Sequence, residues 1–186
     1  MNIFNIRDKT RYETDRLTIR RFRRADWKDL HEYLSDKEVV RYEPYGVHSE
    51  WESKREAARR ATDDRFWAVC LKGTGKLIGN VYFAKRDYDA RELGYAFNRA
   101  YHGNGYATEA CRKFLSLAFE NWGVHRVYAQ CNPDNTASWR LLERLGMQRE
   151  AHLRKNVFFK RDGRGNPIWW DTYEYSQLGA GHITRG

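Results

Sequence analysis

The pattern of apolar and polar residues changes its period once near the middle of the chain. Between Arg91 and Phe97 larger apolar side chains occupy every second position, which is the alternation of a β-strand with two different faces. Between Ala107 and Ala118 apolar residues instead recur three or four positions apart, as on one face of an α-helix. The intervening residues 102–107 read HGNGYA. The pattern therefore predicts a strand, a glycine loop and a long helix in direct succession.

The same patterns predict further elements on both sides of this stretch. The residues before it predict strands at 16–20, 66–71 and 77–83, a helix opening at 25–26 and a second helix from Ser49 to about Thr62. The residues after it predict a strand at 125–131, a helix that Asp134 or Asn135 caps and Gly146 ends, and a hairpin of 147–159 with 168–178. Residues 1–13 are expected to be a polar arm and residues 179–186 a loose tail.

The glycine loop between strand and helix has the composition of an anion site. Glycines let the backbone approach a ligand, and the free N–H groups and positive end of a helix N-terminus favour a phosphate there. An ordinary turn that needs glycine for a positive φ is the alternative. A P-loop would require Lys and Ser or Thr where Tyr106 and Ala107 stand, and a dinucleotide fingerprint would require an acidic residue where His125 and Arg126 stand. Both of these motifs fit poorly.

Three segments in this order resemble the GNAT N-acetyltransferases. The loop is similar to that family's acyl-CoA motif, with Gly105 and Ala107 in the small positions and His102 where Gln or Arg is usual. The segments 132–138, NPDNTAS, and 143–147, ERLGM, resemble those of the branch that includes the ribosomal-protein N-terminal acetyltransferases. The likeness extends from about Thr14 to Leu178.

This resemblance implies a fold and an activity. The expected fold is an α/β mixed sheet in one domain over residues 1–186, mostly antiparallel, with one parallel pair of strands that splay apart and helices on the flanks. The expected reaction is direct transfer of the acetyl group of acetyl-CoA to an amine within a ternary complex. The resemblance further implies a monomer or a homodimer.

The resemblance also assigns residues to the coenzyme. The backbone near Ala96 would bind the oxygen of the tetrahedral intermediate, Phe97 and Asn98 would pair with the pantetheine arm, and Asn135 would contact a pantetheine amide unless it only caps its helix. The loop residues expected at the diphosphate are His102, Gly103, Asn104, Gly105, Tyr106, Ala107 and Thr108.

Two residues are the expected catalytic groups. An alkyl amine is mostly protonated at neutral pH, so a base must accept its proton, and Glu92 is expected to do so directly or through a water. Ser138 is expected to assist the departing thiolate. The structural alternatives are a carboxylate on a solvated strand face and a serine that satisfies backbone groups in the first turn of a helix.

The segment 41–51 is expected to line the acceptor side, with Tyr42, Tyr45 and Trp51 as substrate contacts or, alternatively, as packing residues. The acceptor would be a protein N-terminus, such as that of a ribosomal protein, or a small amine.

Composition narrows the function classes without choosing the acceptor. The chain of 186 residues carries 34 Lys and Arg against 25 Asp and Glu, a net charge of +9 that favours acidic partners such as coenzyme A or RNA. The three cysteines are widely spaced in apolar patterns, which predicts free thiols in a cytoplasmic protein, and no segment is apolar enough to span a membrane. No metal-ligand spacing is present. A CoA-binding or RNA-binding regulatory module without catalysis is the alternative function.

Overall fold

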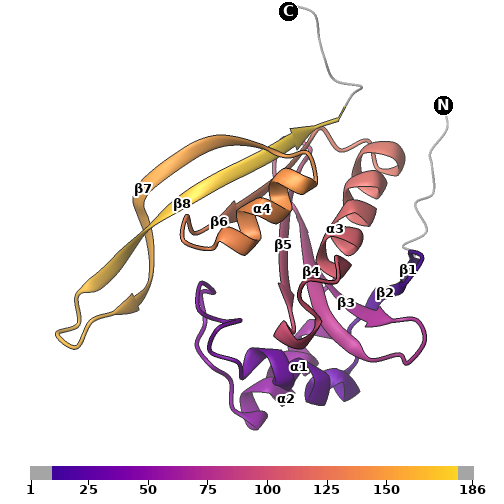
Figure 1. The fold of residues 1–186 in the computed structure, drawn as a ribbon, viewed down its shortest axis with the longest axis horizontal. Coiled ribbons are helices and arrows are strands. Elements are labelled where there is room, and N and C mark those ends of the chain that lie inside the picture. Colours follow the sequence, from indigo (N-terminus) through magenta and orange to yellow (C-terminus); the bar gives the residue numbers. More distant parts are fainter. Residues whose placement is uncertain (1–9, 180–186) are drawn as a thin grey trace, which may run out of the picture.

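A computed structural model describes residues 10–179, which form an eight-stranded mixed sheet with flanking helices (Figure 1). The strands lie in the order β1-β2-β3-β4-β5-β6-β8-β7. Their bounds are β1 Arg11–Glu13, β2 Leu17–Arg21, β3 Phe66–Leu71, β4 Leu77–Lys85, β5 Ala90–Phe97, β6 Arg126–Cys131, β7 Gln148–Arg161 and β8 Pro167–Leu178. The helices are α1 Trp27–Leu34, α2 Glu50–Arg60, α3 Tyr106–Ser116 and α4 Thr136–Arg144, with 3-10 turns η1 Arg24–Asp26 and η2 Arg99–Tyr101 and a π-helical turn η3 Leu117–Asn121.

The parallel pairing of β5 and β6 is short. It begins with Ala90 opposite Arg126 and ends with Glu92 opposite Tyr128, whereas every other pairing in the described sheet is antiparallel. Beyond this point β5 remains paired with β4 as far as Phe97, and β6 remains paired with β8 as far as Cys131. The two central strands therefore part after Glu92, and each keeps only one neighbour.

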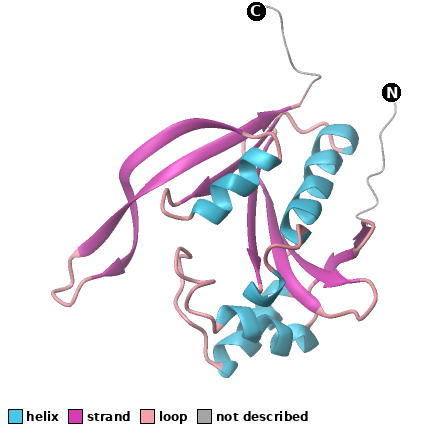
Figure 2. Cartoon of the chain, in the orientation of Figure 1, coloured by secondary structure: helices cyan, strands magenta, loops and turns pink. Residues whose placement is uncertain are grey.

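The two faces of the sheet bury different helices, which Figure 2 shows as two groups. On one face Phe114 of α3 and Leu142 of α4 are fully buried against strand residues such as Leu93 and Val127. On the other face Leu30 of α1 and Ala57 of α2 are buried in a cluster with Ala68 and Ala96. Alternate residues of β5 thus belong to different cores, because successive side chains of a strand point to opposite faces.

The fold expected from the sequence is confirmed, including the mostly antiparallel sheet and its single parallel pair in the described residues. One boundary is corrected: Arg11–Glu13, expected within a polar arm, form strand β1 against β2. Their alternation is too short to recognise in the sequence. The remainder of the arm, residues 1–9, and residues 180–186 of the expected tail lie outside the described part of the chain.

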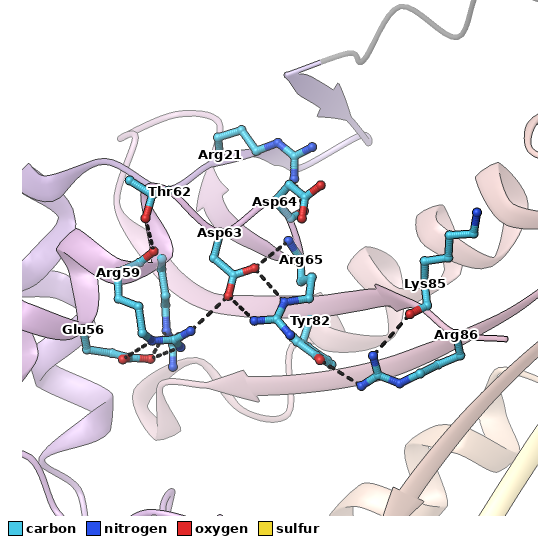
Figure 3. Close-up of polar contacts among 11 residues, drawn as sticks. Arg21, Glu56, Arg59, Thr62, Asp63, Asp64, Arg65, Tyr82, Lys85 and Arg86 are labelled. Carbon is cyan, nitrogen blue, oxygen red and sulfur yellow. Dashed lines mark hydrogen bonds and ion pairs between the residues drawn. The ribbon is translucent and has the colours of Figure 1, made fainter.

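A cluster of ion pairs extends from the end of α2 to the turn before β3 (Figure 3). Glu56 accepts hydrogen bonds from Arg59 at 2.7 and 2.8 Å and from the Arg60 Nε at 2.7 Å. Arg60 is only 2% exposed, and its Nη1 also donates to the Asn80 Oδ1 at 2.9 Å. A buried guanidinium is tolerated when its donors are paired in this way. The cluster therefore fixes α2 against the sheet.

Glu56 makes this cluster sensitive to acid. Burial alone raises the pKa of Glu56, but the hydrogen bonds from Arg59 and the charge of Arg60 prevail and lower it to about 2. A carboxyl group whose pKa is lowered on folding stabilises the protein above its unfolded pKa and loses that contribution as the pH falls toward its folded pKa.

We expect the difference in unfolding free energy between the wild type and Glu56→Gln to be about 3 kcal/mol at pH 7 and to shrink toward zero between pH 5 and pH 2. Urea unfolding at a series of pH values measures this difference. Glu50→Gln, which removes an exposed carboxylate from the same helix, is the control and should show a small difference at every pH. If the difference in unfolding free energy between the wild type and Glu56→Gln were the same at every pH, Glu56 would not be the source of the acid sensitivity.

Candidate active site

A cavity of about 980 Å³ opens where β5 and β6 separate. One wall is the start of α3 and the preceding loop, another is one face of α4 from Ala137 to Arg144, and the floor is β5 from Glu92 to Phe97. Residues of the α1–α2 loop and of the β7–β8 hairpin line the remaining sides. Parts of the chain far apart in sequence therefore share one cavity.

The glycine loop presents unused amides to this cavity. Gly103 and Gly105 have φ of 78° and 79°, a conformation that favours glycine, and Gly105 is the N-cap of α3. From Gly103 to Thr108 no backbone N–H donates to an acceptor in the described part of the protein, and the first such bond is from Glu109 to Gly105 at 3.0 Å. These amides together with the helix dipole make a site for a phosphate group.

The register of β5 decides which backbone groups face the gap. At the two ends of its ladder with β4, Asn98 N donates to Ile78 O and Arg86 N donates to Ala90 O, both at 2.9 Å, and no register shift occurs between them. Because hydrogen-bonded and non-hydrogen-bonded pairs alternate in antiparallel strands, even-numbered residues of β5 point their backbone groups at β4. The odd-numbered residues point theirs away from β4. Beyond Glu92 no strand within residues 10–179 pairs with this side of β5.

This register corrects the backbone roles expected of Ala96 and Asn98. The N–H of Ala96 points at β4, so the amides that face the gap are those of Tyr95 and Phe97. Asn98 donates its N–H to Ile78, its side chain caps the η2 turn at Ala100 and bonds to Glu32, and it does not line the cavity. Neighbouring residues of a strand point their amides in opposite directions. The spacing of motifs in the sequence does not tell which of two neighbours faces the gap.

His102 and Asn104 support the loop. His102 Nε2 lies 2.9 Å from Phe97 O, and since a carbonyl can only accept, this nitrogen carries the hydrogen. The Asn104 side chain donates to the carbonyls of Tyr101 and His102 at 3.2 and 3.1 Å and does not line the cavity. Tyr106, Ala107 and Thr108 do line it.

Glu92 lies at the point where the strands part and lines the cavity. Its Oε2 makes an ion pair with Arg86, which comes from the end of the β4–β5 hairpin. Arg86 is also held by the Tyr82 hydroxyl at 3.1 Å and the Lys85 carbonyl at 3.2 Å (Figure 3). These contacts place the Glu92 carboxylate and leave its Oε1 as the oxygen outside the ion pair.

Ser138 belongs to a hydrogen-bond cluster across the gap. The Tyr95 hydroxyl donates to Ser138 O at 3.0 Å and lies 2.9 Å from Ser138 Oγ, which connects β5 to α4. Burial raises the pKa of Tyr95 well above its usual value, so this phenol stays protonated. Burial likewise raises the pKa of Cys131 to about 11, although the Ser138 hydroxyl opposes the shift. The Asn135 Oδ1 accepts from Ser138 N at 3.3 Å as the cap of α4, and Asn135 also lines the cavity.

Comparisons with known proteins agree with this geometry. A model of the acetyltransferase (GNAT) domain matches residues 16–148. The chain belongs to the GNAT acetyltransferase family. An uncharacterized N-acetyltransferase, YnaD, of Bacillus subtilis is 36% identical over 170 residues, which cover 89% of this chain and 95% of that protein.

Further relatives extend this likeness. The crystal structure of a GNAT-family acetyltransferase from Bacillus anthracis has a TM-score of 0.82 and 36% identity, covering 90% of this chain and 98% of that one. The [ribosomal protein uS5]-alanine N-acetyltransferase of Escherichia coli is more distant, at 24% identity over 78% of this chain and 82% of that protein. This chain is accordingly an acetyl-CoA-dependent N-acetyltransferase that transfers the acetyl group to an amine.

In this GNAT domain the loop between α1 and α2, which was expected to line the acceptor side, lines one side of the cavity. Tyr42 and Tyr45 line it, and the Tyr42 hydroxyl donates to Asp134 O at 3.3 Å, which ties the loop to the start of α4. Tyr45 stacks on His48. Trp51 does not line the cavity: it is 63% exposed on α2 and contacts Arg55. Its ring lies on the outer face of the helix, which the aromatic composition of the segment did not reveal.

Two cavity residues were missed in the sequence. Tyr95 was interpreted only as a member of the strand pattern, although a tyrosine that is buried needs a partner for its hydroxyl. Glu43, beside Pro44 in the α1–α2 loop, was given no role in the sequence analysis, yet it lines the cavity. The one available signal for Glu43 was an acidic residue between two tyrosines that were themselves candidate contacts.

Two further searches concern metals and membranes. Within residues 10–179 no group of three or more His, Cys, Asp or Glu side chains is arranged to hold a metal ion. Over the same residues, no helix has the length and apolar character needed to cross a membrane.

We expect Gly105→Ala to weaken acetyl-CoA binding about tenfold, because a residue with a Cβ at this φ costs roughly 1–2 kcal/mol and turns the loop amides away from the phosphate position. Isothermal titration calorimetry measures the affinity. Gly73→Ala is the control, since Gly73 lies in a hairpin where an added Cβ meets no atom within 4 Å and φ is not positive. An unchanged affinity in Gly105→Ala would argue against the loop as the phosphate site.

Proposed function

We propose that acetyl-CoA lies with its diphosphate against the amides of residues 103–108 and its pantetheine arm along the free edge of β5. The observation that carries this proposal is the coincidence, in one cavity, of unused loop amides and a strand edge without a neighbour. An extended pantetheine can pair with the backbone of Tyr95 and Phe97 as a missing strand would. Asn135 is close enough to this path to contact a pantetheine amide through its side-chain NH₂.

In this arrangement the thioester lies near the point where β5 and β6 part. The N–H of Tyr95 or Phe97 would stabilise the oxygen of the tetrahedral intermediate. Glu92 would accept a proton from the attacking nitrogen, directly or through a water, at the oxygen that Arg86 leaves unpaired. The Ser138 hydroxyl would supply a hydrogen bond to the departing thiolate, with Tyr95 holding it in place.

For the acceptor we propose a primary amine that reaches the cavity beneath the α1–α2 loop. A protein N-terminus, including that of a ribosomal protein, is supported by the distant likeness to the uS5-alanine acetyltransferase and by the branch-like segments at 132–138 and 143–147. A small amine is the other possibility within the same chemistry. Tyr42, Tyr45, Phe159 and Trp170 would contact the carbon skeleton of either acceptor.

Release of free CoA thiol from acetyl-CoA tests this function. The panel should contain N-terminal peptides with alanine or serine at the first position, polyamines and free amino acids. Turnover with the N-terminal peptides but with no other amine of the panel would favour a protein N-terminus as the acceptor. Binding of acetyl-CoA without thiol release for any amine would instead indicate a regulatory module.

We expect Glu92→Gln to lower kcat/KM for the amine about 10²- to 10⁴-fold with little change in acetyl-CoA affinity, because the amide cannot accept the proton. Steady-state kinetics and calorimetry separate the two effects. Glu120→Gln, which removes a carboxylate bonded to Ser116 on the far end of the α3 region, is the matched control. Equal activity of the wild type and Glu92→Gln would remove Glu92 from the mechanism.

We expect Ser138→Ala to lower kcat about tenfold while KM for acetyl-CoA stays near the wild-type value, since a thiolate leaves readily and the hydroxyl adds only one hydrogen bond. Ser116→Ala, at a partly buried serine of α3 that donates to Glu120 outside the cavity, is the control. A loss confined to KM would show that Ser138 binds the coenzyme and does not assist the leaving group.

A further inference from the structure

Four carboxylates line the cavity, and three of them already have a positively charged or N–H partner. Glu92 is paired with Arg86. Glu38 lies 3.7 Å from Arg41, and Asp171 is 2.7 Å from His152 Nε2 and accepts from Lys155 N at 2.9 Å. The fourth, Glu43, has no Lys, Arg or His nitrogen within 4.0 Å in the described part of the chain.

The position of Glu43 directs it to the acceptor side. The α1–α2 loop packs against the face of β5 that carries Ala96, because Val39 and Tyr45 belong to the same core cluster as Ala96. Glu92 and Ala96 lie on one face of β5, since side chains two or four residues apart in a strand point the same way. Glu43 and Glu92 thus line the same cavity, one from the α1–α2 loop and the other from β5.

The surroundings of Glu43 favour the uptake of a proton or of a cation. Burial raises the pKa of Glu43, and the Tyr45 phenol on the same loop and the Arg60 charge from α2 oppose the shift without cancelling it. Arg60 is itself bonded to Glu56 and Asn80, and Tyr33 of α1 donates to the same Asn80 oxygen at 2.9 Å. A half-buried carboxylate that makes no ion pair within 4.0 Å among the described residues is stabilised by an ammonium group that enters the cavity.

We propose that Glu43 binds the acceptor as an ammonium ion and removes one proton from it before the nitrogen attacks. This inference rests on the proposed function of the cavity and adds a residue to it. Amine acetylation releases two protons from an ammonium nitrogen, and the two carboxylates would take one each.

The steps balance as follows. The Glu43 carboxylate takes a proton from R–NH₃⁺, which leaves a neutral amine with a free electron pair. This pair forms the C–N bond to the thioester carbon, and the C–S bond then breaks, with its electron pair leaving on sulfur. The second nitrogen proton passes to Glu92 and from there, through water, to the thiolate. The products are the acetylated amine, free CoA thiol and one proton that Glu43 returns to solvent.

The test is the pH dependence of kcat/KM for the Glu43→Gln variant, measured with the best acceptor of the amine panel. At pH 7 we expect kcat/KM to fall about 10²- to 10⁴-fold, with acetyl-CoA affinity unchanged by calorimetry. The ratio of wild-type to Glu43→Gln kcat/KM should shrink about tenfold for each unit by which the pH rises toward the pKa of the amine. The fraction of neutral amine then grows about tenfold per unit, and the neutral amine does not need Glu43 to remove a proton. The deficit of Glu92→Gln should not shrink in this way.

Two further variants separate this role from a structural one. Glu43→Asp keeps a carboxylate and should keep the wild-type pH profile at a lower rate. Glu50→Gln removes a carboxylate of the neighbouring helix that lies outside the cavity and should behave as the wild type. Thermal melting of each variant confirms that it folds.

The outcomes distinguish this inference from the function on which it rests. Absence of thiol release by the wild type with every amine would overturn the proposed function and this inference with it. Wild-type turnover that Glu43→Gln retains, or a Glu43→Gln deficit that is the same at every pH, would overturn the role of Glu43 alone.

Discussion

The separation of β5 from β6 after Glu92 is the constraint on which the site depends. Paired strands satisfy each other's N–H and C=O groups, and an interior strand that loses its neighbour exposes a row of groups that must find other partners. Here the pairing ends at Glu92 opposite Tyr128, while β4 and β8 continue to hold the two strands from their outer sides. The gap is therefore rigid, and it leaves an edge that an extended ligand can complete.

The elements around this gap are fixed by interactions that do not depend on a ligand. The hydroxyl of Tyr95 connects β5 to α4 across the opening, and His102 connects the glycine loop back to Phe97. The Tyr42 hydroxyl connects the α1–α2 loop to the residues before α4 by a hydrogen bond to Asp134 O. Because both walls and the roof are held in place, the entropy of arranging the site is lost on folding and not on binding.

Charge is distributed unevenly around the cavity although the chain is basic as a whole. The glycine-loop end of the cavity offers backbone amides and a helix N-terminus, which favour an anion, and Arg16 lies beside Gly105 while Arg99 lines the cavity nearby. Glu38, Glu43 and Glu92 line the same cavity, where they would suit the cationic amine proposed as the acceptor. The net charge of +9 therefore predicted an acidic partner and gave no sign of these carboxylates.

The sequence alone determined the order of strands and helices, the glycine loop before α3 and the family, because apolar period, capping residues and glycine positions are local properties. The tertiary structure decided the rest. Whether odd- or even-numbered residues of β5 point their N–H groups at the gap depends on the register with β4, and this register changed the backbone roles expected of Ala96 and Asn98. The outward position of Trp51 depends on which face of α2 is buried. The ion pair of Glu92 with Arg86, and the position of Glu43 in the cavity with no ion pair among the described residues, depend on side chains that only the folded chain brings together, and such contacts leave no periodic pattern in the sequence.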